Sequence, residues 1–430
     1  MIPLAWDEVE ALELGRLAGR PEDGVIRRVH DDSRQARSGD LFVALNTGTR
    51  FVDDALGRGA ATLVPHDQEQ ALATLAGLVR SLSDADVVAV VGSTGKTTTK
   101  DALGALSAAV TPTVAAEASR NNELGLPLTV LRLEPETRVL VAEMGMRGLG
   151  QIAELCAVAR PTVALVTSIG PEHLELVGTV ADVARANAEA LDALPSGGVA
   201  VVPADEALLE PYLRAELDIR RFDRGSVERL ERGDGGRARW RFGLASGSID
   251  LGLPFDQRHL AENVLAALTA YEALGLPLGR AHEGAGSIVL SRWRGEVREL
   301  PGGGFVVNDA YNANPTSMRA ALADLVERAG GRRRVAILGE MAELGAESAR
   351  YHDEIRSLLR ELGVEVVIAV GEPARSYLDE PAAGAAVADA AAFVDVVDVL
   401  EPGDAILVKA SRAVGLEGIP ALIEKHSRAW

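Results

Sequence analysis

The feature that most constrains the fold is an apolar run that leads directly into a glycine-rich turn. Residues 86–91 read DVVAVV, residues 92–99 read GSTGKTTT, and an Ala- and Leu-rich stretch follows. Small residues let backbone N–H groups turn inward around phosphate oxygens, and the next helix directs its positive end at them. This pattern is typical of a phosphate-binding loop, although the spacing GxxGKT is shorter than the commoner GxxxxGKT. An ordinary turn with an exposed lysine is the alternative.

Apolar strand-like runs alternate with helical patterns along most of the chain. In the middle of the sequence this alternation predicts a mostly parallel sheet with helices on both faces. After residue 300 a similar alternation predicts a second doubly wound, Rossmann-like sheet. A chain of 430 residues is also too long for one ordinary core. We therefore expect an α/β protein with an N-terminal domain at 1–84, a central P-loop domain at 85–298 and a C-terminal domain at 299–430.

The charge balance argues against a nucleic-acid-binding protein, and the single cysteine excludes an intrachain disulfide. The net charge is −19 and no cluster of Lys or Arg offers a footprint for nucleic acid, which an acidic surface would repel. Cys156 has no partner for an intrachain disulfide, and its helical-looking stretch predicts a buried structural thiol. The first residues are acidic rather than basic, and no run of about 18 apolar residues occurs. We expect a cytoplasmic monomer without stable membrane insertion.

Four residues near the phosphate loop are candidates for nucleotide and metal chemistry. Lys96 can reach the β and γ phosphates, and the hydroxyl of Thr97 can ligate Mg²⁺. Glu143 ends the run VLVAE, and a carboxylate at the end of a parallel strand near such a loop usually serves Mg²⁺. A solvated glutamate at a strand end is the alternative. His173 follows another strand. It is a candidate metal ligand, and a loop residue that is hydrogen-bonded to backbone is the alternative.

Longer runs are more specific than these single residues. The central part contains VVGSTGKTTTK, SRNNELGLPLTVL, VAEMGMRGLGQIAEL and VTSIGPEHLE, which together look like the central domain of the Mur ligases. NDAYNANPTSM, LGEMAELGAESARYHDEI and LVKASRAVGLE resemble the C-terminal domain of the branch that adds D-alanyl-D-alanine. DSRQARSGDLFVAL resembles the family's uridine-nucleotide domain. YNANPTSM at 311–318 is the most specific motif, and the DNPR motif of a sister ligase is absent.

The resemblance implies an activity that the phosphate loop alone leaves open, since such loops also serve motors, switches and kinases. It implies an ATP- and Mg²⁺-dependent ligase in which a carboxylate attacks the γ-phosphate and an amine then attacks the acyl phosphate. The implied substrates are a UDP-N-acetylmuramoyl tripeptide and D-alanyl-D-alanine, in the synthesis of peptidoglycan precursors. Metal ions and cationic side chains would neutralise the repulsion between the two anions. The C-terminal domain would act after closing onto the central domain.

The resemblance also implies roles for individual residues, which are carried over by their place in the motifs. The catalytic group is Lys96, Asn122, Glu143 and His173, and the metal would be held by Thr97, Glu143 and His173. The nucleotide would be bound by Gly92, Ser93, Thr94, Gly95, Lys96, Thr97, Thr98, His259, Asn263, Arg294 and Asp309. The other substrates would be bound by Ser33, Arg34, Asn121, Tyr311, Asn312, Asn314, Lys409, Ser411 and Arg412. For His259 and Asn263, an ordinary helix-capping role is the alternative.

Two departures from the family pattern bear on metal and substrate. The family places a carbamylated lysine in the helix after the histidine motif, where this chain has Asn187. Because hard cations prefer anionic oxygen, we expect a weaker, differently ligated or lost second Mg²⁺ site. Glu189 is a poor substitute because residues two apart on a helix face different ways. The family's DGHDF-like run is replaced by NTGTRFVDDAL at 46–56, which leaves the nucleotide-sugar site altered.

These departures keep two further hypotheses open. One is a ligase of the same chemistry that acts on a different carboxylate in a specialised pathway, which the N-terminal departure favours. The other is a non-catalytic protein of this type that binds nucleotide or precursor, which Asn187 favours. Intact Lys96, Thr97 and Glu143 argue against the second. A generic motor or switch is the least favoured, since YNANPTSM is not expected in one.

Replacement of the loop lysine tests the phosphate assignment. We expect Lys96→Ala to abolish ATP turnover while the fold stays intact, because a surface-facing loop lysine adds little to stability. The measurements are the turnover rate and the thermal unfolding midpoint of the purified protein. Retention of most of the rate would show that Lys96 does not clamp the phosphates.

Overall fold

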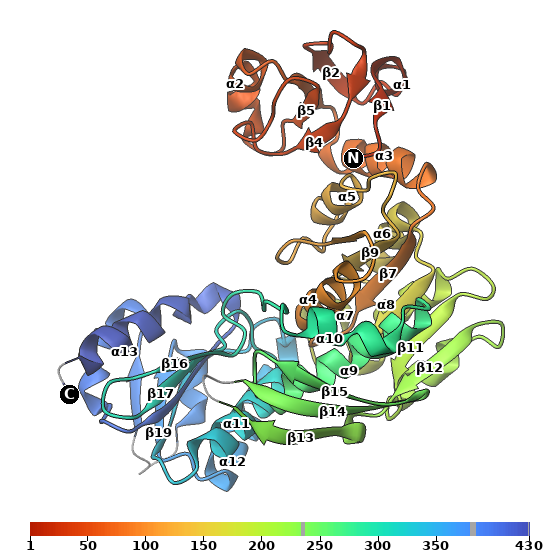
Figure 1. Ribbon diagram of the computed structural model, residues 1–430. Helices are drawn as coiled ribbons and strands as arrows, with labels where there is room; N and C mark the ends of the chain where they lie inside the picture. Colours follow the sequence, from red (N-terminus) through yellow and green to blue (C-terminus); the bar gives the residue numbers. More distant parts are fainter. Residues whose placement is uncertain (234–236, 379–383, 429) are drawn as a thin grey trace.

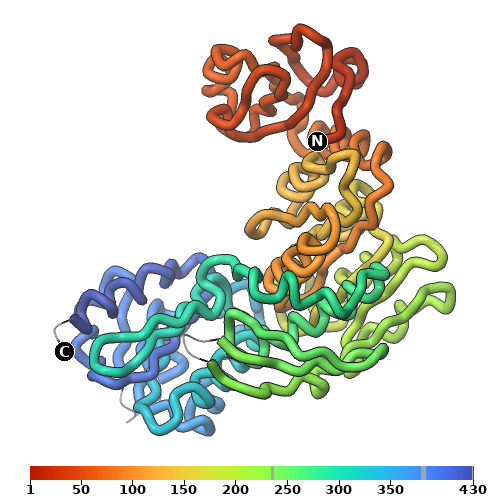
Figure 2. The backbone as a smooth tube through the Cα atoms, viewed as in Figure 1, coloured from red at the N-terminus to blue at the C-terminus, as the bar shows by residue number. Residues whose placement is uncertain are grey.

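The computed structural model describes residues 1–233, 237–378, 384–428 and 430. These residues form an N-terminal body, a central body and a C-terminal body, arranged along a bent path (Figures 1 and 2). The central body lies between the other two, so that the first and last bodies are far apart. No helix among the described residues is both long enough and apolar enough to cross a bilayer.

The N-terminal body is built on a small mixed sheet with the strand order β2–β6–β5–β4. Helix α3 leads out of it and is capped by Asp67, whose carboxylate accepts a hydrogen bond from the Gln70 N–H (2.9 Å). The apolar face of α3 packs on α5 (Gly125–Val130) and α6 (Gln151–Ala159) of the central body, which joins the two bodies. The strands are β1 (Leu4–Ala5), β2 (Gly15–Ala18), β3 (Val25–Ile26), β4 (Arg28–His30), β5 (Asp40–Val43) and β6 (Ala61–Pro65). The helices are α1 (Trp6–Glu10), α2 (Val52–Gly57) and α3 (Gln68–Ser81).

The central body contains a parallel sheet with the order β12–β11–β10–β7–β9–β8. Along β7, Val87, Ala89 and Val91 face one helical layer, while Val88 and Val90 face the other. Burial on both faces explains the uninterrupted apolar run, and it confirms the predicted α/β class. The strands are β7 (Asp86–Val91), β8 (Thr113–Ala115), β9 (Val139–Glu143), β10 (Val163–Val166), β11 (Val199–Pro203) and β12 (Asp218–Phe222). The helices are α4 (Lys96–Ala108), α5 (Gly125–Val130), α6 (Gln151–Ala159), α7 (Leu174–Val177), α8 (Val180–Asp192), α9 (Arg258–Ala273) and α10 (His282–Ala285).

An antiparallel sheet beside α9 was not expected from the sequence. It consists of β13 (Val227–Arg232), β14 (Ala238–Leu244) and β15 (Gly247–Leu253). In β14 the buried residues Trp240 and Phe242 alternate with the exposed Arg239 and Arg241. This period of two is the signal of a half-buried strand, and the buried side chains pack into the cluster that contains α9.

The C-terminal body has a sheet with the order β16–β17–β21–β18–β19–β20, in which β16 alone among the described strands of this sheet runs antiparallel to its neighbour. Helices α11 and α12 cover one face and α13 the other, as the doubly wound pattern predicted. The strands are β16 (Glu296–Glu299), β17 (Phe305–Asn308), β18 (Arg334–Gly339), β19 (Val366–Val370), β20 (Gly384–Val387) and β21 (Ala405–Lys409). The helices are α11 (Pro315–Ala329), α12 (Ser348–Glu361) and α13 (Ile419–Ser427).

The single cysteine gives a test of the packing between α6 and β9. Cys156 is buried, its Sγ lies 3.6 Å from the Sδ of Met144, and burial raises the pKa of its thiol to about 12. Because the thiolate is the reactive form, we expect no reaction with a thiol reagent at pH 8 in the native protein and full reaction after denaturation. Rapid reaction of the native protein in a colorimetric thiol assay would contradict this packing.

Candidate active site

The turn between β7 and α4 leaves no room for side chains at two positions. Gly92 has φ +125° and Gly95 has φ +84°, a region that L side chains rarely adopt. A Cβ on Gly92 would lie 2.3 Å from the Thr167 hydroxyl, and a Cβ on Gly95 would lie 2.2 Å from Oδ1 of Asn263. The backbone is therefore packed closely on both sides, and the two glycines are required by space as well as by conformation.

The segment that follows β10 holds this turn in shape. The Ser93 N–H donates to the Ser168 carbonyl (2.8 Å), and the Ser93 hydroxyl donates to the Gly170 carbonyl (3.1 Å). The Thr94 N–H donates to the Ser168 hydroxyl (3.0 Å), and the Thr167 hydroxyl donates to the Thr94 carbonyl (2.6 Å). The first backbone N–H groups of α4 have no carbonyl within their own helix to bond, so the loop is preformed with donors at a helix N-terminus.

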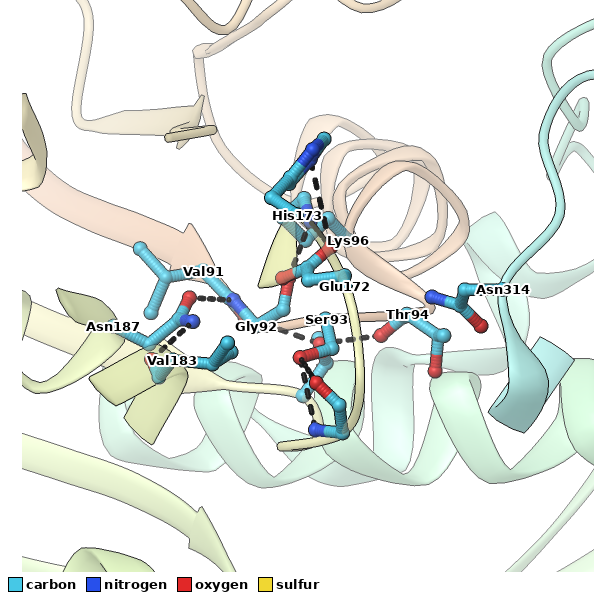
Figure 3. Close-up of polar contacts among 12 residues, drawn as sticks. Val91, Gly92, Ser93, Thr94, Lys96, Glu172, His173, Val183, Asn187 and Asn314 are labelled. Carbon is cyan, nitrogen blue, oxygen red and sulfur yellow. Dashed lines mark hydrogen bonds and ion pairs between the residues drawn. The ribbon is translucent and has the colours of Figure 1, made fainter. Parts of the chain in front are cut away.

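Lys96 is not surface-facing, so that part of our expectation was wrong. Its side chain is 17% exposed and folds back over the loop, where Nζ donates to the Gly92 carbonyl and lies 3.6 Å from Oε2 of Glu172 (Figure 3). Burial raises the pKa of the Glu172 carboxyl above its ordinary value, and the positive charges of the nearby Lys96 and His173 offset only part of this rise. Glu172 was missed in the sequence, although its place directly before His173 in a loop after a strand was the available signal.

Glu143 collects several of the predicted groups at the end of β9. Its side chain is buried, and Oε1 accepts hydrogen bonds from the Thr97 hydroxyl (3.1 Å) and from Nδ2 of Asn121 (2.8 Å). Oε2 is also buried, and it has no hydrogen-bond partner among the described residues. Nη2 of Arg294 donates to the Thr97 hydroxyl from the linker before the C-terminal body (2.9 Å). A buried carboxylate oxygen without a partner beside a threonine hydroxyl fits a site for Mg²⁺.

His173 lies between the central and C-terminal bodies. Its backbone is left-handed (φ +50°), its Nδ1 contacts a carboxylate oxygen of Glu343, and its Nε2 lies 4.0 Å from Glu172 Oε2. Across the described ranges, no group of three or more His, Cys, Asp or Glu side chains is placed to hold a metal ion. A cation at this site would therefore need oxygen ligands from Thr97, water or phosphate, and the role of His173 as a metal ligand stays a prediction.

Asn187 supports the phosphate loop through hydrogen bonds. It is buried, Oδ1 accepts a hydrogen bond from the Gly92 N–H (2.7 Å), and Nδ2 donates to the Val183 carbonyl (2.9 Å) (Figure 3). Glu189 points elsewhere, as expected, because its carboxylate accepts from the N–H groups of Gly150 (2.6 Å) and Ala153 (3.0 Å) at the start of α6. Both ends of the Asn187 amide are thus bonded to backbone.

The predicted nucleotide residues come from α9, the linker and the C-terminal body. Asn263 lies against Gly95, and His259 is half-buried one turn before it on α9. The guanidinium of Arg294 lies over the ring of Tyr311, 3.9 Å from its centroid. Asp309 is paired with Lys409, with 2.5 Å between Oδ2 and Nζ. The structure therefore brings Asn263 and Arg294 to the phosphate loop, while Asp309 is engaged within its own body.

Several predicted substrate residues brace the loops that carry the others. Lys409 is buried and also donates to the Asn312 carbonyl (2.9 Å). The Ser411 hydroxyl accepts from the Ala342 N–H (2.8 Å). Asn314 caps α11, with Oδ1 accepting from the Ser317 N–H (2.8 Å). These bonds give Lys409, Ser411 and Asn314 a structural role whatever they bind.

Asn122, which was predicted as a catalytic residue, is a local cap, and the substrate candidates Asn312 and Arg412 are exposed. Asn122 accepts a hydrogen bond from the Gly125 N–H (2.9 Å) at the start of α5. Asn312 is exposed, and the guanidinium of Arg412 lies 4.3 Å from the ring centroid of Trp293.

Ser33 and Arg34 lie between β4 and β5 in the N-terminal body, away from the phosphate loop (Figure 1). The Ser33 hydroxyl donates to Asp54 Oδ2 (2.8 Å). Arg34 is exposed and holds the pKa of the Asp32 carboxyl at about 2 through their hydrogen bonds.

Comparison with known proteins decides the family. Residues 90–271 match the family described as the Mur ligase middle domain, and residues 293–412 match the Mur ligase, glutamate ligase domain. A relative from Synechocystis sp., named UDP-N-acetylmuramoyl-tripeptide--D-alanyl-D-alanine ligase, is 32% identical over 93% of this chain and 92% of its own. The chain belongs to the Mur ligase family. A relative of the same name from Escherichia coli is 30% identical to this Mur ligase, over 99% of each chain.

Solved structures agree with this assignment of the Mur ligase. MurF from Acinetobacter baumannii superposes with a TM-score of 0.85 at 28% identity and covers 98% of this chain and 99% of that chain. MurF from Thermotoga maritima, solved in complex with ADP, gives a TM-score of 0.81 at 27% identity, over 94% and 98% of the two chains. The family predicted from YNANPTSM and the P-loop run is therefore confirmed.

The bond between Asn187 and the loop can be tested directly. We expect Asn187→Leu to weaken nucleotide binding by roughly a factor of 10, because the buried Gly92 N–H loses its acceptor at a cost of about 1–3 kcal/mol. Calorimetric titration with ADP and the unfolding midpoint of the free protein would measure the effect. Unchanged values for both would show that the bond does not shape the loop.

Proposed function

We propose that this Mur ligase joins D-alanyl-D-alanine to a UDP-N-acetylmuramoyl tripeptide with consumption of ATP, in peptidoglycan precursor synthesis. The observation that carries the proposal is the full-length similarity to relatives of that name, with 99% of both chains covered for Escherichia coli. The cluster of Lys96, Thr97, Glu143 and Arg294 supports it, because these groups suit phosphoryl transfer to a carboxylate.

The proposed division of labour follows the three parts of the chain. Residues 1–84 would hold the uridine nucleotide, residues 85–298 would bind ATP, and residues 299–430 would bind the amine. Contacts between the last two support this, since Tyr311 donates a hydrogen bond to the Ser119 hydroxyl of the central body (2.5 Å). Location in the cytoplasm and a monomeric state stay predictions of the sequence.

The first task of the site is to hold the triphosphate. The N-terminus of α4 presents backbone N–H groups and the positive end of its dipole to the phosphates. Lys96 would leave the Gly92 carbonyl and Glu172 and turn to the β and γ phosphates, which offer it a stronger negative charge. We propose Thr97 and Glu143 as holders of Mg²⁺, because the partnerless Oε2 of Glu143 fits a cation. Bound there, Mg²⁺ would neutralise part of the phosphate charge.

The second task is to bring two anions together. The substrate carboxylate must attack the γ-phosphate, which gives an acyl phosphate and ADP, and the amine must then displace phosphate from the acyl carbon. Arg294 is placed to lower the repulsion, since its guanidinium reaches the Thr97 hydroxyl (2.9 Å) from the linker. Asn121, bonded to Glu143, would orient the reacting groups from the opposite side. His173 would serve a second cation or its waters.

The N-terminal body favours one alternative, a ligase of the same chemistry for a different carboxylate. The Ser33 hydroxyl, which the resemblance assigns to the uridine nucleotide, donates to Asp54 in the altered segment 46–56. Phe51 in that segment is 50% exposed. A changed surface at this place would change which nucleotide-linked carboxylate fits.

The deciding experiment is phosphate release from ATP with Mg²⁺, D-alanyl-D-alanine and the UDP-linked tripeptide, with each component omitted in turn. We expect release to require every component and to yield the pentapeptide product by mass spectrometry. Release with another nucleotide-linked carboxylate alone would favour the alternative. ATP binding without amine-dependent release in any combination would contradict a catalytic role.

A further inference from the structure

Lys100 is a buried cation that phosphate binding does not use. Its side chain is 1% exposed, and Nζ donates to the carbonyls of Ala116 and Ala118, both at 2.9 Å. Nζ also lies 2.6 Å from Oδ1 of Asp101. An ammonium has three N–H donors, so these three oxygens satisfy it completely. This arrangement fixes the backbone that carries the two carbonyls, because movement of either one would leave the buried ammonium without one of its hydrogen-bond partners.

The carbonyls that Lys100 holds belong to the segment 116–122 after β8. Ala118 adopts a left-handed conformation (φ +49°), which is unfavourable for alanine and persists only when its surroundings enforce it. Further along the segment, the Ser119 hydroxyl accepts from Tyr311, and Asn121 donates to Glu143. Lys100 thus fixes the start of a segment whose far end contacts the carboxylate of the site.

Asp101 holds a second segment, the linker into the C-terminal body. Its Oδ2 accepts hydrogen bonds from the N–H (3.0 Å) and the hydroxyl (2.9 Å) of Ser291. Arg294 follows three residues later and donates to the Thr97 hydroxyl. The same carboxylate therefore joins the Lys100 ammonium to the stretch that delivers the arginine of the site.

The spacing along α4 ties both contacts to the phosphate loop. Lys100 lies four residues after Lys96, and Asp101 lies four residues after Thr97. Residues four apart are neighbours on one face of a helix. A movement of the first turn of α4 would therefore carry the Lys100 and Asp101 contacts with it.

We propose that Lys100 and Asp101 are positioning residues, which place Asn121 and Arg294 on either side of Thr97 and Glu143. The proposal rests on the proposed ligase function, because it assigns these two residues to the geometry of that reaction. They do not touch the substrates. They act by holding the two segments that do, so their loss should slow the chemical step more than it weakens nucleotide binding.

Arg80, on α3 of the N-terminal body, offers a matched control. Like Lys100 it is a buried cation that donates to backbone carbonyls, those of Ala159 (2.8 Å) and Ser83 (2.6 Å). The bond to Ala159 joins α3 to the end of α6, and the bond to Ser83 holds the residues that follow α3; both lie away from the phosphate loop. Arg80→Met should lower the unfolding midpoint as Lys100→Met does, yet leave the chemistry unchanged.

The experiment compares Lys100→Met, Asp101→Asn and Ser291→Ala with Arg80→Met in the complete enzyme. We expect Lys100→Met to lower kcat about 100-fold, the cost of displacing reacting groups by about 1 Å, and to change the ADP dissociation constant less than about threefold. Asp101→Asn and Ser291→Ala should each lower kcat about tenfold, since each releases one segment. Arg80→Met should keep kcat within about threefold of the parent.

A kcat within threefold of the parent for both Lys100→Met and Ser291→Ala would overturn the proposal. Equal losses of kcat in Lys100→Met and Arg80→Met would also overturn the proposal, because they would show that general destabilisation lowers the rate. If Lys100→Met does not fold, the kcat values of Asp101→Asn and Ser291→Ala decide whether the proposal holds.

Hydrogen exchange separates this idea from the ligase assignment. With ADP bound, amides of residues 116–122 should exchange faster in Lys100→Met than in the parent, and not in Arg80→Met. Equal exchange in all three proteins would refute the positioning role even if ligase activity were present. A parent enzyme without amine-dependent phosphate release would refute the ligase function, and the exchange result would still decide the positioning role.

Discussion

Close approach of backbone at the turn from β7 into α4 is the constraint on which the site depends. Side chains of α9 and of the segment after β10 come so near to Gly92 and Gly95 that a methyl group would collide with them. Asn187 of α8 accepts a further hydrogen bond from the Gly92 N–H, and α4 begins directly after Gly95. Once the start of α4 is fixed, Lys96 and Thr97 have defined places, and the groups that meet them must come from other elements.

Charge is distributed so that an acidic protein can hold anions at one place. The chain carries −19 overall, yet Lys96 and Arg294 converge on the loop from α4 and from the linker. Their neighbours are buried carboxylates, and a buried charge is tolerated only with partners. A similar rule acts at the contact between the bodies, where Asp256 beside α9 is buried against Arg328 of α11. Separation of the bodies would break this ion pair and leave Asp256 with Arg232 (2.9 Å) and Arg328 with Asp324 (3.6 Å) as the partners within their own bodies.

Much of the fold was predictable because its signals are local. A strand buried on both faces needs an uninterrupted apolar run, which is how β7, β9 and β19 were found. The hairpin strands β13 to β15 were missed because a half-buried strand alternates apolar with polar residues and so lacks an uninterrupted apolar run. In the site, Thr97 and Glu143 were chosen by motif and do lie together. Glu172 was missed although it directly precedes His173, and Lys100 was not chosen because nothing in a single sequence separates it from a solvated charge.

The sequence by itself determined the α/β class, the phosphate loop and the family, since each rests on contiguous residues whose spacing is a matter of local geometry. Tertiary structure alone decided that Lys96 folds back beside Glu172, that Asn187 bonds to Gly92, and that Lys409 braces its loop. The residues in each of these contacts lie from about 75 to more than 90 positions apart in the sequence. A side chain's partners at such separations depend on how helices pack across a sheet, and no local pattern encodes that packing.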